Sequence, residues 1–368
     1  MSPKLELVAL RKEYDDGAVI AVDGIDLEVA QGETLALLGP SGCGKSTTLN
    51  MIVGLEAPTS GNIRIDGVSV VDKPPSERNV GLVFQDYAVF THMTVAANLA
   101  FGLVVRGLPR AEVERRVREV ASLLDLVPLL KEPTSRLGGS QLQRVAIGRT
   151  LVTRPALLLL DEPLSNLEAE ARLAMRRELR RLQAETGLTI IYVTHDQVEA
   201  LSLAARIAVM SHGRIRQCAT ATEVYQHPAH SFVAGFLGMP AMNLVRGELA
   251  RGPDGWVFQR GRFLVPLPDA MVPPSTTVGT RIELGIRAEA LRPLADFANA
   301  PLAGRVRAIE PRGSDSVVTV EVEDVTLRLI VIPPTVAELG QELALAADAT
   351  GLVLFNGDNG YALPAGAP

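Results

Sequence analysis

A glycine-rich segment between an apolar run and an amphipathic run most constrains how this chain folds. Residues 34–38 predict a buried strand, and residues 45–55 predict a helix that starts inside the segment. The segment fits the pattern G-x-x-x-x-G-K-[ST], and its members are Gly39, Pro40, Ser41, Gly42, Cys43, Gly44, Lys45, Ser46 and Thr47. A strand, a tight loop and a helix in this order predict an α/β domain with a phosphate-binding loop.

Each residue type in the loop has a physical reason to be there. Glycines let the backbone bend and bring N–H groups against phosphate oxygens without a Cβ in the way. Lys45 is predicted to place its charge on the β- and γ-phosphates of a nucleotide, and Ser46 to offer its hydroxyl to Mg²⁺. We interpret Cys43 as a small filler and not as a redox switch. An ordinary glycine-rich turn is the alternative, and the flanking strand and helix disfavour it.

Two carboxylates follow a second apolar run, at Asp161 and Glu162 after residues 157–160. In open α/β sheets, ligands bind at the carboxyl ends of the strands. Asp161 is therefore predicted to reach Mg²⁺, directly or through water. Glu162 is predicted to point the other way along the pleat and to orient the water that attacks the γ-phosphate. A solvated acidic turn is the alternative, and the phosphate loop makes it the weaker one.

Two more polar residues come soon after apolar runs. Gln85 follows residues 80–84, and His195 follows residues 189–193. The oxygen of Gln85 can bind a metal ion or a water. His195 can contact the γ-phosphate or hold the attacking water, although a lone histidine is more often structural. Both are predicted at the same edge of the sheet as the acidic pair.

The arrangement of the runs predicts two domains. Strands alternating with helices at 109–126, 141–152 and 167–183 predict a mainly parallel sheet with helices on its faces. Turn signals at residues 15–17 and 66–67 predict an antiparallel β layer beside it.

Helical periodicity fades after residues 235–240. Short β-like runs then predict a small sandwich or barrel, at residues 282–286, 317–322, 326–332 and 351–355. We place the domains at residues 1–236 and 237–368.

Composition excludes several classes of protein. Of 368 residues, 47% are hydrophobic, which excludes wholesale disorder, and 36 basic against 42 acidic residues give a net charge of −6. That excess of acid disfavours a nucleic-acid partner. Two cysteines, Cys43 and Cys218, fit a reducing compartment. Neither a secretion signal nor a bilayer span is expected, so work at a membrane would depend on another protein.

Together and in this order, the motifs resemble the ABC-transporter ATPases, and the resemblance extends over nearly the whole chain. It is closer to the importer ATPases of the maltose and glycerol-phosphate type. The stretches that carry this closer resemblance are residues 84–90, 92–95, 194–200, 232–236 and 285–287. The resemblance implies a P-loop NTPase domain with a helical subdomain, followed by a small all-β, OB-like domain that braces and regulates a dimer.

The same resemblance implies ATP hydrolysis with Mg²⁺ between two head-to-tail ATPase domains. One chain would supply Lys45, Ser46, Gln85, Asp161, Glu162 and His195. The other would supply a signature segment, here Gly138, Gly139, Ser140 and Gln141. Tyr14 stands where the family stacks an aromatic ring on adenine; packing on the protein surface is its alternative.

Two segments depart from the family. The family signature is Leu-Ser-Gly-Gly-Gln, whereas this chain reads Leu137-Gly138-Gly139-Ser140-Gln141. Loss of one charge-assisted hydrogen bond to phosphate, about 1.5–3 kcal/mol, predicts slowed but not abolished closure. Glu168 replaces the family's aspartate, which puts communication between the two sites in question.

The resemblance also implies partners and a place of work. The second ATPase subunit is either a copy of this chain or a different one. Transmembrane permease subunits and, indirectly, an extracytoplasmic solute-binding protein complete an importer at the cytoplasmic face of the inner membrane. The expected solute is a sugar, polyol or glycerol-phosphate type of molecule. Polyamine, sulfate or ferric-ion import, or a weakly active regulatory half of an unequal pair, are the alternatives.

Overall fold

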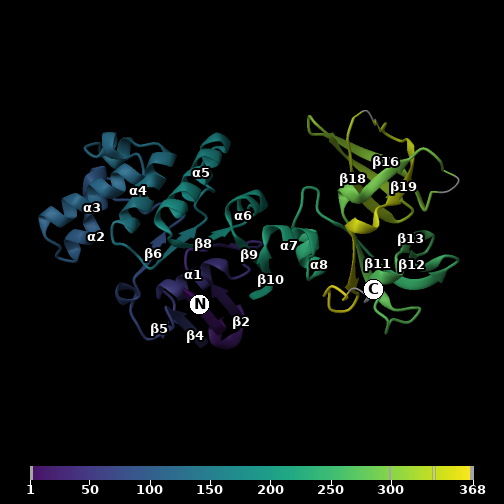
Figure 1. Cartoon of the computed structure of the whole chain (residues 1–368), viewed down its shortest axis with the longest axis horizontal. Helices are drawn as coiled ribbons and strands as arrows, with labels where there is room; N and C mark the ends of the chain where they lie inside the picture. The colour runs from purple at the N-terminus through teal and green to yellow at the C-terminus, as the bar shows by residue number, and fades with distance from the viewer. Residues whose placement is uncertain (1–2, 298–299, 334, 336, 365–368) are drawn as a thin grey trace. The chain divides into compact units, whose positions relative to one another are not determined.

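The computed structural model describes residues 3–297, 300–333, 335 and 337–364. The chain forms two compact units, Met1–Ala221 and Thr222–Pro368 (Figure 1). Each unit has its own sheets and its own hydrophobic core. The domain boundary predicted between residues 236 and 237 stays a prediction, because a compact unit and a domain need not end at the same residue.

A six-stranded sheet organises the first unit, in the order β10-β9-β3-β8-β7-β6. β6, β7, β8, β3 and β9 run parallel, and β10 is antiparallel to β9. The strands are β3 (Thr34–Leu38), β6 (Val80–Val83), β7 (Leu157–Asp161), β8 (Thr189–Thr194), β9 (Arg206–Ser211) and β10 (Arg214–Thr220). The predicted, mainly parallel sheet is therefore confirmed.

Helices surround this sheet, and three of them form a separate layer. α2, α3 and α4 lie together beside β6 (Figure 1). The helices are α1 (Lys45–Val53), α2 (Val95–Val105), α3 (Arg110–Leu123), α4 (Gly139–Leu151), α5 (Ala169–Thr186) and α6 (Gln197–Leu203). The four predicted helices are confirmed to within a few residues. α1 stops earlier than predicted because Gly54 takes the left-handed conformation that ends helices.

A second sheet of the first unit is antiparallel throughout, in the order β2-β1-β4-β5. Its strands are β1 (Leu5–Tyr14), β2 (Val19–Val29), β4 (Ser60–Ile65) and β5 (Val68–Ser69). The predicted turns join them: Asp16 and Gly17 between β1 and β2, and Asp66 and Gly67 between β4 and β5, all with positive φ. The predicted antiparallel layer is confirmed.

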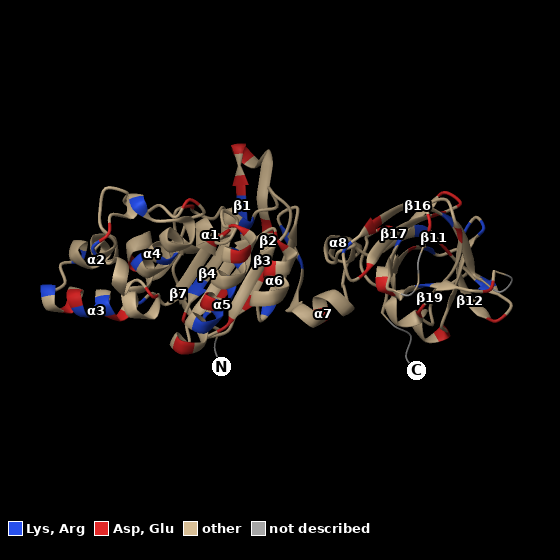
Figure 2. Ribbon diagram, turned by 90° about the horizontal axis from the view of Figure 1, so that it is seen from above, with Lys and Arg blue, Asp and Glu red and all other residues tan. Residues whose placement is uncertain are grey.

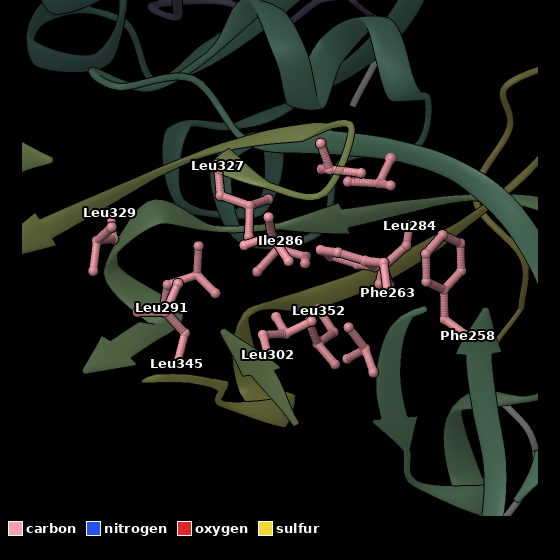
Figure 3. Packing of buried hydrophobic residues seen from close by; sticks show 14 of the residues in the cluster. Phe258, Phe263, Leu284, Ile286, Leu291, Leu302, Leu327, Leu329, Leu345 and Leu352 are labelled. Atoms are coloured by element: carbon pink, nitrogen blue, oxygen red, sulfur yellow. The ribbon is translucent and has the colours of Figure 1, made fainter. Parts of the chain in front are cut away.

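The second unit consists of two short helices and two antiparallel five-stranded sheets. Their orders are β13-β12-β11-β14-β20 and β15-β19-β16-β17-β18. The elements are α7 (Ala221–Gln226), α8 (Ser231–Phe236), β11 (Asn243–Gly252), β12 (Gly255–Arg260), β13 (Phe263–Leu267), β14 (Arg281–Ile286), β15 (Leu291–Leu294), β16 (Leu302–Pro311), β17 (Ser316–Val322), β18 (Val325–Val331), β19 (Glu342–Ala347) and β20 (Leu352–Asn356). Both sheets contribute to one core, in which Phe258, Ile286 and Leu327 are fully buried (Figure 3). The predicted all-β C-terminal region is confirmed.

Basic and acidic residues both occur along α3 (Figure 2). α3 pairs Arg110 with Glu114 and Arg115 with Glu112 at helical spacing. Within the part of the chain that the structure describes, no helix is long and apolar enough to cross a membrane.

Candidate ATP site

The glycine-rich loop joins β3 to α1, and its backbone leaves no room for side chains at two glycines. A Cβ on Gly44 would lie 2.3 Å from the carbonyl oxygen of Ala21, and Gly44 has a φ of +104°. A Cβ on Gly39 would lie 2.4 Å from the carbonyl oxygen of Met210. These two positions therefore require glycine, which leaves a narrow loop at the N-terminus of α1.

Lys45 is held inside this loop. Only 6% of the residue is exposed, and its Nζ donates to the carbonyl oxygens of Gly39 and Pro40 at 2.8 Å each. The Sγ of Cys43 lies 3.8 Å from the same nitrogen. Burial raises the pKa of the Cys43 thiol, so it stays protonated at neutral pH and fits the predicted role of a filler. The ammonium group is thus fixed where a phosphate would meet it.

Ser46 and Asp161 lie together at the mouth of the loop. Ser46 Oγ donates to Asp161 Oδ1 at 3.1 Å. Burial raises the pKa of Asp161, the hydrogen bond from Ser46 opposes this, and the neighbouring charge of Glu162 adds to it. A hydroxyl beside a carboxylate is the oxygen donor set that Mg²⁺ takes from proteins when phosphate oxygens and water complete its shell.

The residues present therefore fit a Mg²⁺ ion bound together with nucleotide. Within the described residues, no cluster of three or more His, Cys, Asp or Glu side chains could hold a metal ion by itself.

Glu162 connects the acidic pair to the other two predicted residues. Its Oε1 lies 3.1 Å from Nδ1 of His195, and its Oε2 accepts from Nε2 of Gln85 at 3.3 Å. The structure thus brings Gln85, Glu162 and His195 together. They come from the loops after β6, β7 and β8, which are neighbours in the sheet.

The direction of Glu162 has a different cause from the one predicted. β7 ends at Asp161, and Glu162 has left the strand with a φ of 45°. Its N–H donates to the carbonyl of Val193 at 3.1 Å, which holds the residue in the left-handed region. A non-glycine residue in this region carries backbone strain, a feature that collects at functional sites. The pleat of β7 therefore does not set this side chain's direction.

The segment after Glu162 fixes Gln85, which the sequence did not reveal. Asn166 Nδ2 donates to the backbone oxygen of Gln85 at 2.8 Å, and the side chain of Gln85 donates to Ser165 Oγ at 3.4 Å. Ser165 Oγ in turn donates to the carbonyl of Glu162 at 2.9 Å. The sequence signal that could have indicated this contact is the polar pair Ser165-Asn166, which comes soon after the acidic pair.

The segment 138–141 begins α4. Gly138 is the N-cap residue, and its N–H donates to Gln141 Oε1 at 3.1 Å. In the described chain, no hydrogen bond of these four residues reaches the phosphate loop of the same chain. A Cβ on Gly138 would meet nothing within 4 Å, so a serine would fit there.

Tyr14 is the last residue of β1 and pairs with Val19 at the start of β2. Lys12 Nζ lies 4.8 Å from the centre of its ring, and the ring is half-buried. Ala21, two residues beyond Val19, borders the phosphate loop. Tyr14 is thus placed in the same β hairpin that borders the loop.

Comparison with known protein families gives three matches along the chain. The ABC transporter family model matches residues 22–165, the MalK OB fold domain matches residues 238–291, and the TOBE domain matches residues 284–355. The first match contains the phosphate loop and the acidic pair. The other two cover most of the β-rich second unit.

Individual relatives match over nearly the full length. An sn-glycerol-3-phosphate import ATP-binding protein of Rhizobium johnstonii is 42% identical over 98% of this chain and 96% of its own. A sulfoquinovosyl glycerol transport ATP-binding protein of Agrobacterium fabrum is 42% identical over 95% of this chain and 97% of its own.

A solved structure matches as well. It is cbiO1 of Clostridium perfringens, part of the ABC transporter complex cbiONQ, with a TM-score of 0.56 and 32% identity. It covers 61% of this chain and 91% of that one. The fold, the strand-end site and these matches agree: the chain belongs to the ABC transporter family, as an ATP-binding subunit whose ATP hydrolysis is coupled to transport.

Proposed function

We propose that this chain powers the import of sn-glycerol 3-phosphate or a related glycerol-bearing solute through a separate permease. The observation that carries the proposal is similarity over the whole chain, second unit included, to two ATP-binding proteins whose names both contain a glycerol compound. Polyamine, sulfate and ferric-ion import are not favoured.

In the proposed site, the loop from Gly39 to Thr47 holds the phosphates of ATP. Lys45 presents a fixed ammonium group to the β- and γ-phosphates, and the N-terminus of α1 adds its partial positive charge. Ser46, Asp161 and Gln85 would hold Mg²⁺, which supplies charge neutralisation on the phosphates when bound. Tyr14 would stack on adenine.

Hydrolysis is assigned to the three residues at the neighbouring strand ends. The carboxylate of Glu162 orients the attacking water and accepts its proton as the water oxygen bonds to the γ-phosphorus. The bond from that phosphorus to the β–γ bridging oxygen breaks in the same reaction, and ADP leaves. The carboxylate of Glu162 has two hydrogen-bond partners: His195 at Oε1 and Gln85 at Oε2. These two bonds hold the carboxylate in one orientation. Gln85 is bonded in turn to the segment of Ser165 and Asn166.

We infer that the complete site needs a second ATPase subunit. Among the described residues, 138–141 make no hydrogen bond to the phosphate loop of the same chain, and the N-terminus of α4 can receive a phosphate from a partner. A homodimer is the main proposal, and the intact Lys45, Asp161, Glu162 and His195 support it. An unequal pair with a different ATPase, in which this chain is the weaker or regulatory half, is the second.

The proposed partners are transmembrane permease subunits, docked near Gln85 and α2, with an extracytoplasmic solute-binding protein acting through them. The place of work is the cytoplasmic face of the inner membrane. ATP binding would close the pair and hydrolysis would reopen it, so different affinities of ATP and ADP for the closed state drive the permease. The C-terminal domain, predicted as residues 237–368, would brace the pair.

Uptake in cells tests the solute. The chain and its permease are deleted together. The permease is then restored with either the wild-type chain or Lys45→Ala, and uptake of labelled sn-glycerol 3-phosphate, maltose and spermidine is measured. We expect only sn-glycerol 3-phosphate uptake to return, and only with the wild type. Restored uptake of maltose or spermidine alone would overturn the assignment of the solute, although not the ATPase.

A further inference from the structure

A buried glutamate in α6 has no part in the chemistry described so far. Glu199 is only 3% exposed, behind the segment that carries His195. One carboxylate oxygen, Oε2, accepts from Thr194 Oγ1 at 2.7 Å. The other, Oε1, is buried without a hydrogen-bond partner in the described chain. A half-bonded buried carboxyl group is costly and calls for an explanation.

The bond to Thr194 controls the backbone on both sides of His195. Thr194 directly precedes His195, and its Oγ1 also accepts from the N–H of Asp196, directly after it, at 3.0 Å. Asp196 Oδ1 then accepts from the N–H groups of Val198 and Glu199 at 2.8 and 3.1 Å, which caps α6. Glu199, Thr194 and Asp196 thus link the residues on both sides of His195 to the first turn of α6.

A small cavity connects Glu199 to the hydrolytic residues. Its volume is about 90 Å³, and Glu162, Ser165, His195 and Glu199 are among its lining residues. A polar cavity of this size has room for water. A proton on Glu199 can therefore exchange with water at the site without a large opening of the fold.

The charges around Glu199 come from two helices and one strand. Asp196 precedes the helix itself, and Arg172 and Arg176 face it from α5. Tyr192 on β8 donates its hydroxyl to the Glu199 carbonyl at 3.3 Å. Glu162 and His195 line the same cavity as Glu199. β3, which also packs on α6, has no titratable side chain. Burial raises the pKa of Glu199 to about 7; Asp196 adds to this, while Thr194 and both arginines oppose it.

We propose that Glu199 is a positioning residue for ATP hydrolysis: its neutral form holds His195 in place through Thr194, and loss of its proton to the cavity water disturbs that arrangement. Arg172 is the group that responds. Its Nη1 lies 3.6 Å from Asp196 Oδ2, and its Nε is buried and unpartnered in the described residues. An ionised Glu199 attracts this guanidinium away from Asp196, and Asp196 caps the helix that follows His195.

The test compares variants of the full-length chain in steady-state ATP hydrolysis with Mg²⁺. Glu199→Gln keeps an acceptor for Thr194 but cannot ionise, Glu199→Ala removes the acceptor, and Thr194→Val removes the link. Glu33→Gln is the control, because Glu33 is a well-buried carboxylate paired with Arg206, away from the site. The rate constant kcat and the KM for ATP are measured from about pH 6 to 8.5, the range in which a group of pKa near 7 titrates.

We expect the ratio of kcat for Glu199→Gln over wild type to rise about fivefold or more across this range, following one ionisation near pH 7. We expect Glu199→Ala and Thr194→Val to lower kcat about tenfold at every pH, with KM for ATP within about twofold, as for a group that acts through another. Glu33→Gln should match wild type. A flat Gln-to-wild-type ratio together with a near-normal Thr194→Val would overturn the proposal, even if Glu199→Ala failed to fold.

This inference rests on the roles proposed for Glu162 and His195, and one further variant separates the two failures. If Glu162→Gln keeps full activity, the proposed hydrolytic site is wrong. If Glu162→Gln is inactive while the Glu199 and Thr194 variants behave as wild type, the site stands and only the role of Glu199 is wrong.

Discussion

The two units bury their strands in different ways. In the first unit, every residue of β3 and β8 is buried, because layers of structure cover both faces of a parallel sheet. In the second, β13 and β18 alternate between buried and exposed residues, because each sheet has one face in the core and one in water.

This difference decides where chemistry can lie. A strand that is buried along its whole length can present polar groups only where it ends. Asp161 is the last residue of β7, and Gln85 and His195 come just after the ends of β6 and β8. A half-buried strand has an exposed face along its whole length, so its polar groups do not gather at the strand ends. Changes in the first unit should therefore act on hydrolysis, and core changes in the second should act on stability.

The largest effect is expected from the core of the second unit. Phe258 is fully buried, with its ring centre 6.0 Å from that of Phe263 in an edge-to-face arrangement (Figure 3). Phe258→Ala should destabilise this unit by about 3–5 kcal/mol through lost burial and the cavity left behind. Urea unfolding of the full chain measures it, with the exposed Val278→Ala as control. If basal ATP hydrolysis fell in proportion, the two units would not be as independent as their separate cores indicate.

The next effect concerns catalysis without loss of stability. Glu162→Gln keeps the shape of the side chain but cannot accept a proton, so kcat should fall about 10²–10⁴-fold. ATP binding should stay within a few-fold, and the unfolding midpoint should not fall. Hydrolysis rates and equilibrium binding of ATP check this on the same preparation; a loss of binding equal to the loss of rate would contradict it.

A smaller effect links Glu199 to the pH dependence of stability. Its pKa is about 7 in the folded chain, against 4.5 for an ordinary glutamate. The native state therefore binds more protons than the unfolded state between these values, and stability falls as pH rises from 4.5 to 7. Relative to wild type, Glu199→Gln should gain about 2–3 kcal/mol between pH 5 and 8. Denaturant unfolding of the first unit at both pH values measures this, and an unchanged difference would show that the carboxyl is already ionised at pH 5.

The smallest effect is expected from restoring the family signature. The double change Gly138→Ser with Ser140→Gly adds a hydroxyl where no atom lies within 4 Å and removes a Cβ near the helix start. One regained hydrogen bond to phosphate, about 1.5 kcal/mol, should raise kcat about tenfold. Rates must be compared at protein concentrations at which two copies of the chain form a dimer in the presence of ATP. No gain there would indicate that Ser140 already supplies the hydroxyl.

Much of the first unit could be predicted because its signals are local. Buried runs, turn residues and the loop pattern each lie within about ten residues, and parallel strand ends bring their polar residues to one edge. What could not be predicted depends on distant partners. Arg78 is buried because it donates to the carbonyls of Met51 and Ile52 at the end of α1, and nothing near Arg78 in the sequence indicates this.

The strands of the second unit were harder to predict, because they also depend on partners that are distant in the sequence. β19 reads Glu-Leu-Ala-Leu-Ala-Ala, residues that favour a helix in isolation, yet it lies between β15 and β16. β11 and β16 contain glycines at positions 247 and 304, where a Cβ would lie 2.5 Å from the carbonyl oxygen of Gln259 or Glu321. These glycines weaken the strand pattern, although close packing requires them.

The strand register of the first unit has one more consequence. Asp161 of β7 lies opposite Val193 of β8, and Leu38 of β3 lies opposite Thr194 of β8. The hydrogen-bond ladder therefore fixes the ends of these three strands at nearly the same level. A slip of one residue would displace an end by about 3.3 Å, a full hydrogen-bond length. The accuracy of the ATP site is thus inherited from the sheet, and a core substitution that shifts one strand would misplace Glu162 or His195 without touching either.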